Sequence, residues 1–178
     1  MKFGIDYFPD AAPEQVSAQR YFEDVLELAE IADDLGYDSV KIVEHYFTSY
    51  GGYSPDPCVF LAACSQRARR MRMVTGAVLP VFNHPLKLAG QLTMLDAISG
   101  GRLDVGVARA FMPYEFDAFG ISMDESRERF EEGVEALRRL WTEENVTFSS
   151  VHKRRSASTP SSNLARLSSI EIPNASNS

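Results

Sequence analysis

The chain has 178 residues, enough for one domain, and its 44% apolar and 24% charged residues are typical of globular proteins. It carries a net charge of −7, and the acidic excess lies before residue 150, which argues against nucleic-acid binding. The sequence contains neither a long apolar run nor an N-terminal signal-peptide pattern, so we expect no membrane segment and a cytoplasmic location.

Two strand–helix units are predicted in the first 70 residues. A strand is predicted over Lys2–Tyr7, and apolar side chains at helical spacing predict a helix over Pro13–Leu35. The second strand is predicted over Ser39–Val43. Its helix is expected to open at Asp56-Pro57, because Asp is a favoured N-cap and Pro suits the first helical position, and to run to about Arg69.

Two further units follow the same plan. The third strand is predicted over Met73–Val78, with a helix from His84-Pro85 to Ile98 that ends at a Ser-Gly-Gly sequence. The fourth strand is predicted over Leu103–Val107. A longer loop is expected next, and then a helix that opens at the capping box Ser122-x-x-Glu125.

The predicted strands are apolar at nearly every position, as in buried parallel sheets, and the repeat is about 30–36 residues long, the size of a βα unit. A doubly wound nucleotide-binding sheet would show a glycine fingerprint after its first strand, and this sequence has none there. A (β/α)₈ barrel needs about 200–250 residues. We therefore predict an α/β fold of TIM-barrel type with about four βα units.

The composition changes after Phe148. Residues 149–178 contain ten Ser and few large apolar side chains, and no periodicity is visible. We therefore predict two regions, a βα barrel portion over residues 1–148 and a disordered Ser-rich tail over residues 149–178. The abrupt change is similar to that of a truncated or frameshifted reading frame.

Cysteine and histidine are sparse. Cys58 and Cys64 match neither a disulfide framework nor a zinc motif and are expected to be small core residues. The three histidines, His45, His84 and His152, include no pair at helical metal-ligand spacing. No metal site is therefore expected.

Three segments together carry a family resemblance: VKIVEHYFTSYGG, TGAVLPVFNHPLKLAGQLTMLDAISGGRLDVGVARAF and EFDAFGISMDESRERF. In order and spacing they resemble the N-terminal half of the luciferase-like flavin-dependent monooxygenases. The resemblance implies a TIM barrel that uses reduced FMN, or a deazaflavin in some branches, together with O₂ and a small organic substrate such as an aldehyde. It also implies a possible flavin reductase partner and a homo- or heterodimer.

The expected dimer interface lies on the helices that follow the second and third strands. In the family these helices meet a second subunit, and here they keep small and apolar side chains. The residues in question are Ala62, Ala63, Ala68, Leu88, Ala89, Leu92 and Leu95.

Reactive residues of α/β barrels follow the carboxyl ends of the strands. By resemblance His45 is the active-site histidine beside the flavin, where an imidazole can exchange protons near neutral pH; the alternative is a histidine that caps a strand end. Arg109 matches a position that contacts the FMN phosphate, a role that suits a guanidinium. Its alternative is an ion pair with Glu115 or Asp117.

Small residues are expected to lie close to the flavin. Thr75, Gly76 and Ala77 match a segment that lies against the isoalloxazine ring and that in the family can include a non-proline cis peptide; the alternative is a β-bulge. Ala108 stands where bacterial luciferase has a cysteine. Five aromatic residues line a substrate pocket or serve only in packing: Tyr46, Phe47, Tyr50, Tyr53 and Phe82.

Three functions remain open at this point. The first is a flavin-dependent monooxygenase with His45 as its catalytic residue. The second is a catalytically inactive, truncated flavin-binding or dimerisation module. The third is an unrelated α/β module, which the several ordered motifs disfavour.

Overall fold

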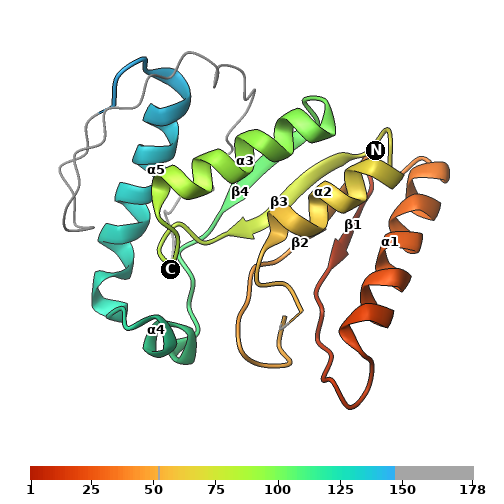
Figure 1. Ribbon diagram of the computed structural model, residues 1–178, viewed down its shortest axis with the longest axis horizontal. Helices are drawn as coiled ribbons and strands as arrows, with labels where there is room; N and C mark the ends of the chain where they lie inside the picture. Colours follow the sequence, from red (N-terminus) through yellow and green to blue (C-terminus); the bar gives the residue numbers. More distant parts are fainter. Residues whose placement is uncertain (52, 147–178) are drawn as a thin grey trace.

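The computed structural model describes residues 1–51 and 53–146, which form a parallel four-stranded sheet with helices packed against it (Figure 1). The strands are β1 (Gly4–Tyr7), β2 (Ser39–Ile42), β3 (Arg72–Val78) and β4 (Leu103–Val107). The helices are α1 (Ala18–Asp34), α2 (Pro57–Arg67), α3 (Pro85–Ser99), α4 (Pro113–Phe119) and α5 (Ser126–Thr142), with a 3₁₀ turn η1 (Met123–Glu125) before α5. The predicted boundary at residue 148 and the Ser-rich tail lie outside the described residues.

The strand order decides between the two architectures. The strands lie in the order β1-β2-β3-β4, and every neighbouring pair is parallel. A doubly wound sheet reverses its strand order at a switch point, whereas a barrel adds each strand beside the previous one. Right-handed crossovers then place successive helices on the same face. The predicted TIM-type arrangement of four βα units is therefore confirmed.

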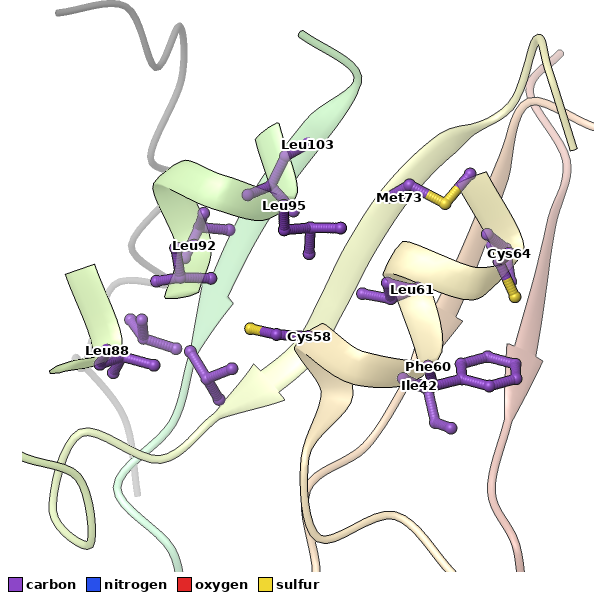
Figure 2. Close-up of a cluster of buried hydrophobic side chains, with 14 of the residues drawn as sticks. Ile42, Cys58, Phe60, Leu61, Cys64, Met73, Leu88, Leu92, Leu95 and Leu103 are labelled. Carbon is purple, nitrogen blue, oxygen red and sulfur yellow. The ribbon is translucent and has the colours of Figure 1, made fainter. Parts of the chain in front are cut away.

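The core lies between that face of the sheet and the helices. In Figure 2, Leu61 and Cys64 of α2 and Leu92 and Leu95 of α3 point towards the strands, and all four are buried. Cys58 is buried in the same cluster, so both cysteines are core residues as expected. Burial raises the pKa of each thiol to about 12, which leaves both largely protonated and unreactive at neutral pH.

The opposite face of the sheet is more polar than predicted. The row Asp6, Lys41, Val74 and Asp104 is aligned in register on this face. Lys41 Nζ lies 2.8 Å from Asp6 Oδ2, and Arg72 pairs with Asp104. The expectation that the strands are apolar on both faces is therefore wrong for this face. Charged side chains are tolerated there because they form ion pairs across neighbouring strands.

Two of the predicted helix starts are confirmed. Asp56 Oδ1 accepts hydrogen bonds from the N–H groups of Cys58 and Val59 at 3.0 and 3.3 Å, and α2 begins at Pro57. His84 caps α3, because its Nδ1 accepts the Leu86 N–H at 3.2 Å, which supports a structural role for this histidine.

Other boundaries differ from the prediction. Helix α1 begins at Ala18, not Pro13, because the Ser17 hydroxyl accepts the Arg20 N–H and caps it there. The loop predicted after β4 contains α4. Ser122 caps η1 by accepting the Asp124 N–H at 3.2 Å, so the long helix starts later, at Ser126.

The five buried positions among the proposed dimer residues contradict part of that expectation. Within the described chain Ala68, Leu88, Ala89, Leu92 and Leu95 are core residues. Side chains that already pack inside one subunit are not available to a second. On the same two helices the exposed apolar residues are Val59, Ala63, Met94, Ala97 and Ile98. None of the helices in the described ranges is both long and apolar enough to cross a bilayer.

Candidate active site

The three segments expected to carry chemistry lie at the same edge of the sheet. Because β2, β3 and β4 are adjacent and parallel, their carboxyl ends lie side by side. His45, the Gly76–Ala77 pair and Arg109 follow these ends in turn. The Ala108 N–H donates to Val78 O at 3.0 Å, which joins the segments after β3 and β4.

The Thr75–Ala77 segment has both features considered for it in the sequence, a non-proline cis peptide and an irregularity in the strand pairing. The peptide bond between Gly76 and Ala77 is cis, and the register between β3 and β4 shifts between Thr75 and Val78. The Thr75 hydroxyl donates to Gly106 O and accepts the Gly106 N–H, both at 2.8 Å. The Thr75 side chain is therefore committed inside the sheet, whereas Ala77 and Ala108 are partly exposed.

His45 is held by a buried carboxylate. Its Nδ1 lies 3.0 Å from Glu115 Oε1, and the exposed fractions of the two side chains are 10% and 0%. The Tyr46 N–H donates to the same oxygen at 2.9 Å. Glu115 lies in the first turn of α4, so the contact joins the segment after β2 to the helix after β4.

Aromatic rings and one glycine limit the space around the imidazole. The ring centroids of Phe8, Tyr50 and Phe111 lie 5.7, 5.1 and 6.0 Å from that of His45. Gly51 has φ +66°, and a Cβ at this position would lie 2.7 Å from the His45 side chain. A larger residue at position 51 would displace the ring.

The five aromatic residues proposed for a pocket divide into separate groups. Tyr50 contacts His45. Tyr46, Phe47 and Phe82 pack against Phe119 of α4, with Phe82 stacked on it at 4.6 Å. The Tyr53 hydroxyl donates to Val16 O at 2.9 Å and its ring contacts Tyr21, so Tyr53 packs beside the start of α1. Tyr46 and Phe82 also line a cavity beside Glu44, and Tyr53 lines another between α1 and α2, so both alternatives stay open for these residues.

Arg109 makes no ion pair within the described parts of the chain, and its side chain is exposed. One of its two expected alternatives was a pair with Glu115. That carboxylate is buried against His45 and Tyr46 instead. The guanidinium therefore remains available to an anion at the edge of the sheet.

Glu44, the neighbour of His45, points to a different set of partners. Its carboxylate accepts hydrogen bonds from the Tyr46 hydroxyl, from the Leu79 N–H at 2.9 Å and from Asn83 Nδ2 at 3.1 Å. Burial raises the pKa of Glu44 to about 7, although these three hydrogen bonds act in the opposite direction. Glu44 thus titrates near neutral pH.

We expect Glu44 to make stability depend on pH. The native state keeps a proton that the unfolded chain releases above a pKa of about 4.3, so stability falls as the pH rises from there to about 7 and is constant above it. The loss is about 3–4 kcal/mol, because the native pKa lies about 2.5 units above the unfolded one. Urea unfolding at pH 5, 6, 7 and 8 measures it.

Glu44→Gln removes the titrating group and should flatten this slope. Glu131→Gln, on an exposed position of α5, is the matched control and should keep it. Equal slopes in the wild type and in Glu44→Gln would contradict the assignment.

Among the described residues no group of three or more His, Cys, Asp or Glu side chains is arranged to hold a metal ion. The site consists instead of a buried His–carboxylate pair, a small-residue backbone segment and an exposed guanidinium. All these residues were named from the sequence, but Glu115 was considered only as an ion-pair partner of Arg109 and not as a partner of His45. No sequence spacing could have found that pair, because its members are 70 residues apart.

Comparison with known proteins identifies the family of the chain. The luciferase-like monooxygenase family model matches residues 1–173, and the chain belongs to this family. The crystal structure of the monooxygenase RslO1 from Streptomyces bottropensis is 62% identical with a TM-score of 0.86, over 90% of this chain and 48% of that one.

Two further relatives depend on a flavin or bind one. The oxygenase component of flavin-dependent trigonelline monooxygenase from Acinetobacter baylyi is 31% identical over 165 residues, 90% of this chain and 46% of the relative. The oxygenating constituent of 3,6-diketocamphane monooxygenase from Pseudomonas putida, solved in complex with FMN, is 25% identical with a TM-score of 0.78, over 90% of this chain and 44% of that one. The chain thus spans about half the length of these relatives.

Proposed function

We propose that this chain provides the flavin-binding edge of a flavin-dependent monooxygenase that uses reduced FMN and O₂ on a small organic substrate such as an aldehyde. The observation that carries the proposal is the arrangement of His45, the Gly76–Ala77 segment and Arg109 along one edge of the sheet, where Arg109 has no ion pair among the described residues. Reactive groups of α/β barrels lie at this edge.

The residues at this edge fit a flavin. Ala77 and Ala108 have small, partly exposed side chains, which allow the backbone to approach a flat ring. Arg109 would bind the phosphate through charge-assisted hydrogen bonds, and His45 would exchange a proton beside the ring. The bound reduced flavin would supply the two electrons of a monooxygenase reaction, in which one oxygen atom of O₂ enters the product and the other is reduced to water. Thr75 would contribute only backbone, because Gly106 occupies its hydroxyl.

FMN is the cofactor we favour over a deazaflavin. The support is the FMN complex of the diketocamphane relative and the 62% identity to a monooxygenase. The deazaflavin alternative has support of its own, since an F420-dependent glucose-6-phosphate dehydrogenase from Intrasporangium calvum is 36% identical over 125 residues. A separate flavin reductase is proposed as a partner, because the trigonelline relative is named as an oxygenase component.

A second candidate function is a catalytically inactive flavin-binding or dimerisation module. It is favoured by the polar face of the sheet, where Lys41 and Asp6 keep exposed side-chain fractions of 41% and 50%. In this case a homo- or heterodimer would form through the apolar residues that remain exposed on α2 and α3, Val59 and Met94 among them.

Flavin titration tests the proposal. We expect purified protein to bind FMN saturably and Arg109→Ala to weaken that binding by roughly tenfold to a hundredfold, because a charge-assisted phosphate contact is worth about 1.5–3 kcal/mol. Riboflavin has no phosphate, so its dissociation constant should be equal for both proteins. Flavin fluorescence measures each titration.

Arg138→Ala is the matched control, because Arg138 is an exposed arginine near the C-terminal end of α5, and it should bind FMN as the wild type does. Equal FMN affinity in Arg109→Ala would refute the phosphate role. If neither flavin binds saturably, the chain is not a flavin-binding unit, and the dimerisation alternative is the one retained.

A further inference from the structure

The carboxylate beside His45 is buried, and one of its two oxygens lacks a hydrogen-bond partner among the described residues. Glu115 is fully buried, and its Oε1 receives both the His45 imidazole and the Tyr46 N–H. Its Oε2 is buried and has no hydrogen-bond partner among the described residues. A buried carboxylate oxygen without a partner costs about 1–3 kcal/mol. An apolar side chain of similar volume would stabilise the fold better, so stability does not account for this residue.

The hydrogen-bond pattern determines the direction of the contact. The Tyr46 N–H can only donate, so Glu115 Oε1 is an acceptor. When Glu115 is ionised, this oxygen can only accept, so the contact with His45 then places the imidazole proton on Nδ1. In the neutral ring Nε2 keeps its lone pair, and it makes no hydrogen bond to any residue that the structure describes.

The other carboxylate near His45 does not compete for the ring. Glu44 is adjacent in sequence, but its oxygens accept from Tyr46, Leu79 and Asn83. Glu115 is therefore the carboxylate that contacts the imidazole. Its own helix is anchored by aromatic packing, since Phe116 and Phe119 both contact Phe82.

We propose that Glu115 is a positioning residue that holds His45 in the Nδ1–H tautomer and leaves Nε2 as the proton-exchanging atom. When Nε2 takes a proton, the carboxylate pairs with the resulting imidazolium, as the buried acid of a catalytic triad does. Because Tyr46 donates to the same oxygen, Glu115 also fixes the backbone beside the ring. This inference rests on the proposed role of His45 in proton exchange.

Nitrogen NMR of the full chain tests the inference without flavin. With ¹⁵N-labelled histidine at a pH of about 9, where histidine is neutral, we expect the wild-type His45 to carry its proton on Nδ1. Glu115→Met removes both acceptor oxygens and should shift the ring to a mixture in which Nε2–H predominates by several-fold. Glu115→Gln keeps an acceptor oxygen and should retain Nδ1–H. His45→Ala assigns the signals.

Asp33→Asn is the matched control, because Asp33 is another buried carboxylate, at the other end of the sheet, and it should leave the His45 signals unchanged. If Glu115→Met does not fold, Glu115→Gln decides: loss of the charge should weaken the hydrogen bond and move the Nδ1 proton upfield, whereas Asp33→Asn should not. A wild-type His45 protonated on Nε2 overturns the proposal, as does a Gln variant with an unmoved proton.

The NMR experiment tests the positioning role of Glu115 and the flavin titration tests the proposed function, so either can be refuted without the other. An Nδ1–H tautomer that depends on Glu115 in a chain that binds no flavin would retain the positioning role and remove the proposed function. If the chain does turn over substrate, Glu115→Met should lower kcat by about tenfold or more with little change in KM, and Glu115→Gln should lower it less. An unchanged kcat in Glu115→Met would contradict the inference.

Discussion

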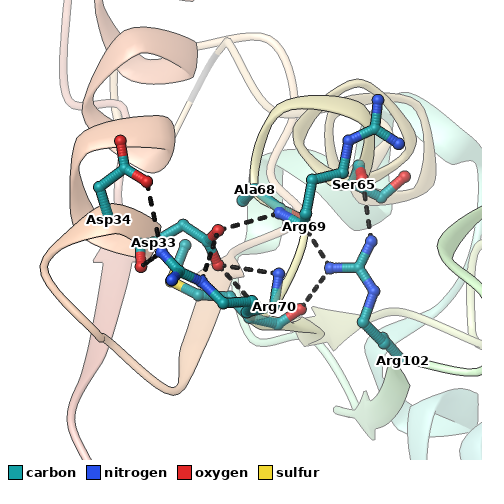
Figure 3. Close-up of polar contacts among 8 residues, drawn as sticks. Asp33, Asp34, Ser65, Ala68, Arg69, Arg70 and Arg102 are labelled. Carbon is teal, nitrogen blue, oxygen red and sulfur yellow. Dashed lines mark hydrogen bonds and ion pairs between the residues drawn. The ribbon is translucent and has the colours of Figure 1, made fainter.

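Arg102→Met should lower the free energy of unfolding by about 3–5 kcal/mol. The guanidinium of Arg102 is partly buried and donates hydrogen bonds to backbone carbonyls from three separate segments. Figure 3 shows the contacts with Ser65 and Ala68 at the end of α2. The carbonyls, with their distances, are Ser65 O at 2.9 Å and Ala68 O, Met71 O and Ser99 O at 2.7 Å each. These groups belong to the ends of α2 and α3 and to the segment before β3. The substitution leaves four carbonyls without this partner.

Urea unfolding at pH 7 measures the loss, with Arg127→Met on the exposed face of α5 as the matched control. Arg102→Lys should recover only part of the stability, because an ammonium cannot reproduce the planar set of guanidinium donors. A loss below about 1 kcal/mol in Arg102→Met would show that solvent satisfies these carbonyls instead.

Asp33→Asn should lower the free energy of unfolding by about 2–4 kcal/mol at neutral pH. Asp33 lies near the end of α1, and its carboxylate accepts the backbone N–H groups of Arg69 and Arg70 at 3.0 Å and of Met71 at 2.8 Å. An Asn side chain has one acceptor oxygen, and its NH₂ group would face a donor. At least one of these N–H groups would lose its bond.

The loss caused by Asp33→Asn should also depend on pH. Burial by itself would raise the pKa of Asp33, but the N–H groups of Met71, Arg70 and Arg69 and the Arg70 guanidinium lower it below its usual value. The stabilisation is therefore complete above the unfolded pKa of about 3.9 and is lost as the pH falls through the lower native pKa. The difference between wild type and variant should be constant from pH 5 to 8 and shrink below pH 4.

Thermal or urea unfolding across this pH range measures the difference. Asp34→Asn is the control, because the neighbouring carboxylate is 81% exposed and should contribute little. Equal losses in Asp33→Asn and Asp34→Asn would mean that the backbone contacts of Asp33 do not stabilise the chain.

These two clusters lie at the opposite end of the strands from the candidate site. Asp33 binds the segment that enters β3, and Arg102 directly precedes β4. In α/β barrels this end serves stability, whereas the carboxyl ends carry function. We therefore expect both variants to change the free energy of unfolding and to leave the His45–Glu115 contact as it is.

Local chemistry in the sequence was sufficient for most of the elements. The helix starts at Pro57 and Pro85 were predictable, because Asp56 and His84 bind N–H groups only two or three residues away. The strand over Leu103–Val107 was predicted with the observed bounds, because a short apolar run after a Gly-Gly pair has few other conformations. The family resemblance, which is confirmed, rested on the same contiguous segments.

Only the tertiary structure decided the features that join distant segments. Helix α4 was not predicted, because its seven residues are too few to show a helical period. Its Glu115 contacts His45 only once the strands are aligned in the sheet. Five of the seven predicted dimer residues lie in the core for a similar reason, since an apolar pattern marks a buried face without indicating which surface covers it. The sequence by itself thus determined the elements and the family, whereas long-range packing determined which carboxylate holds the histidine.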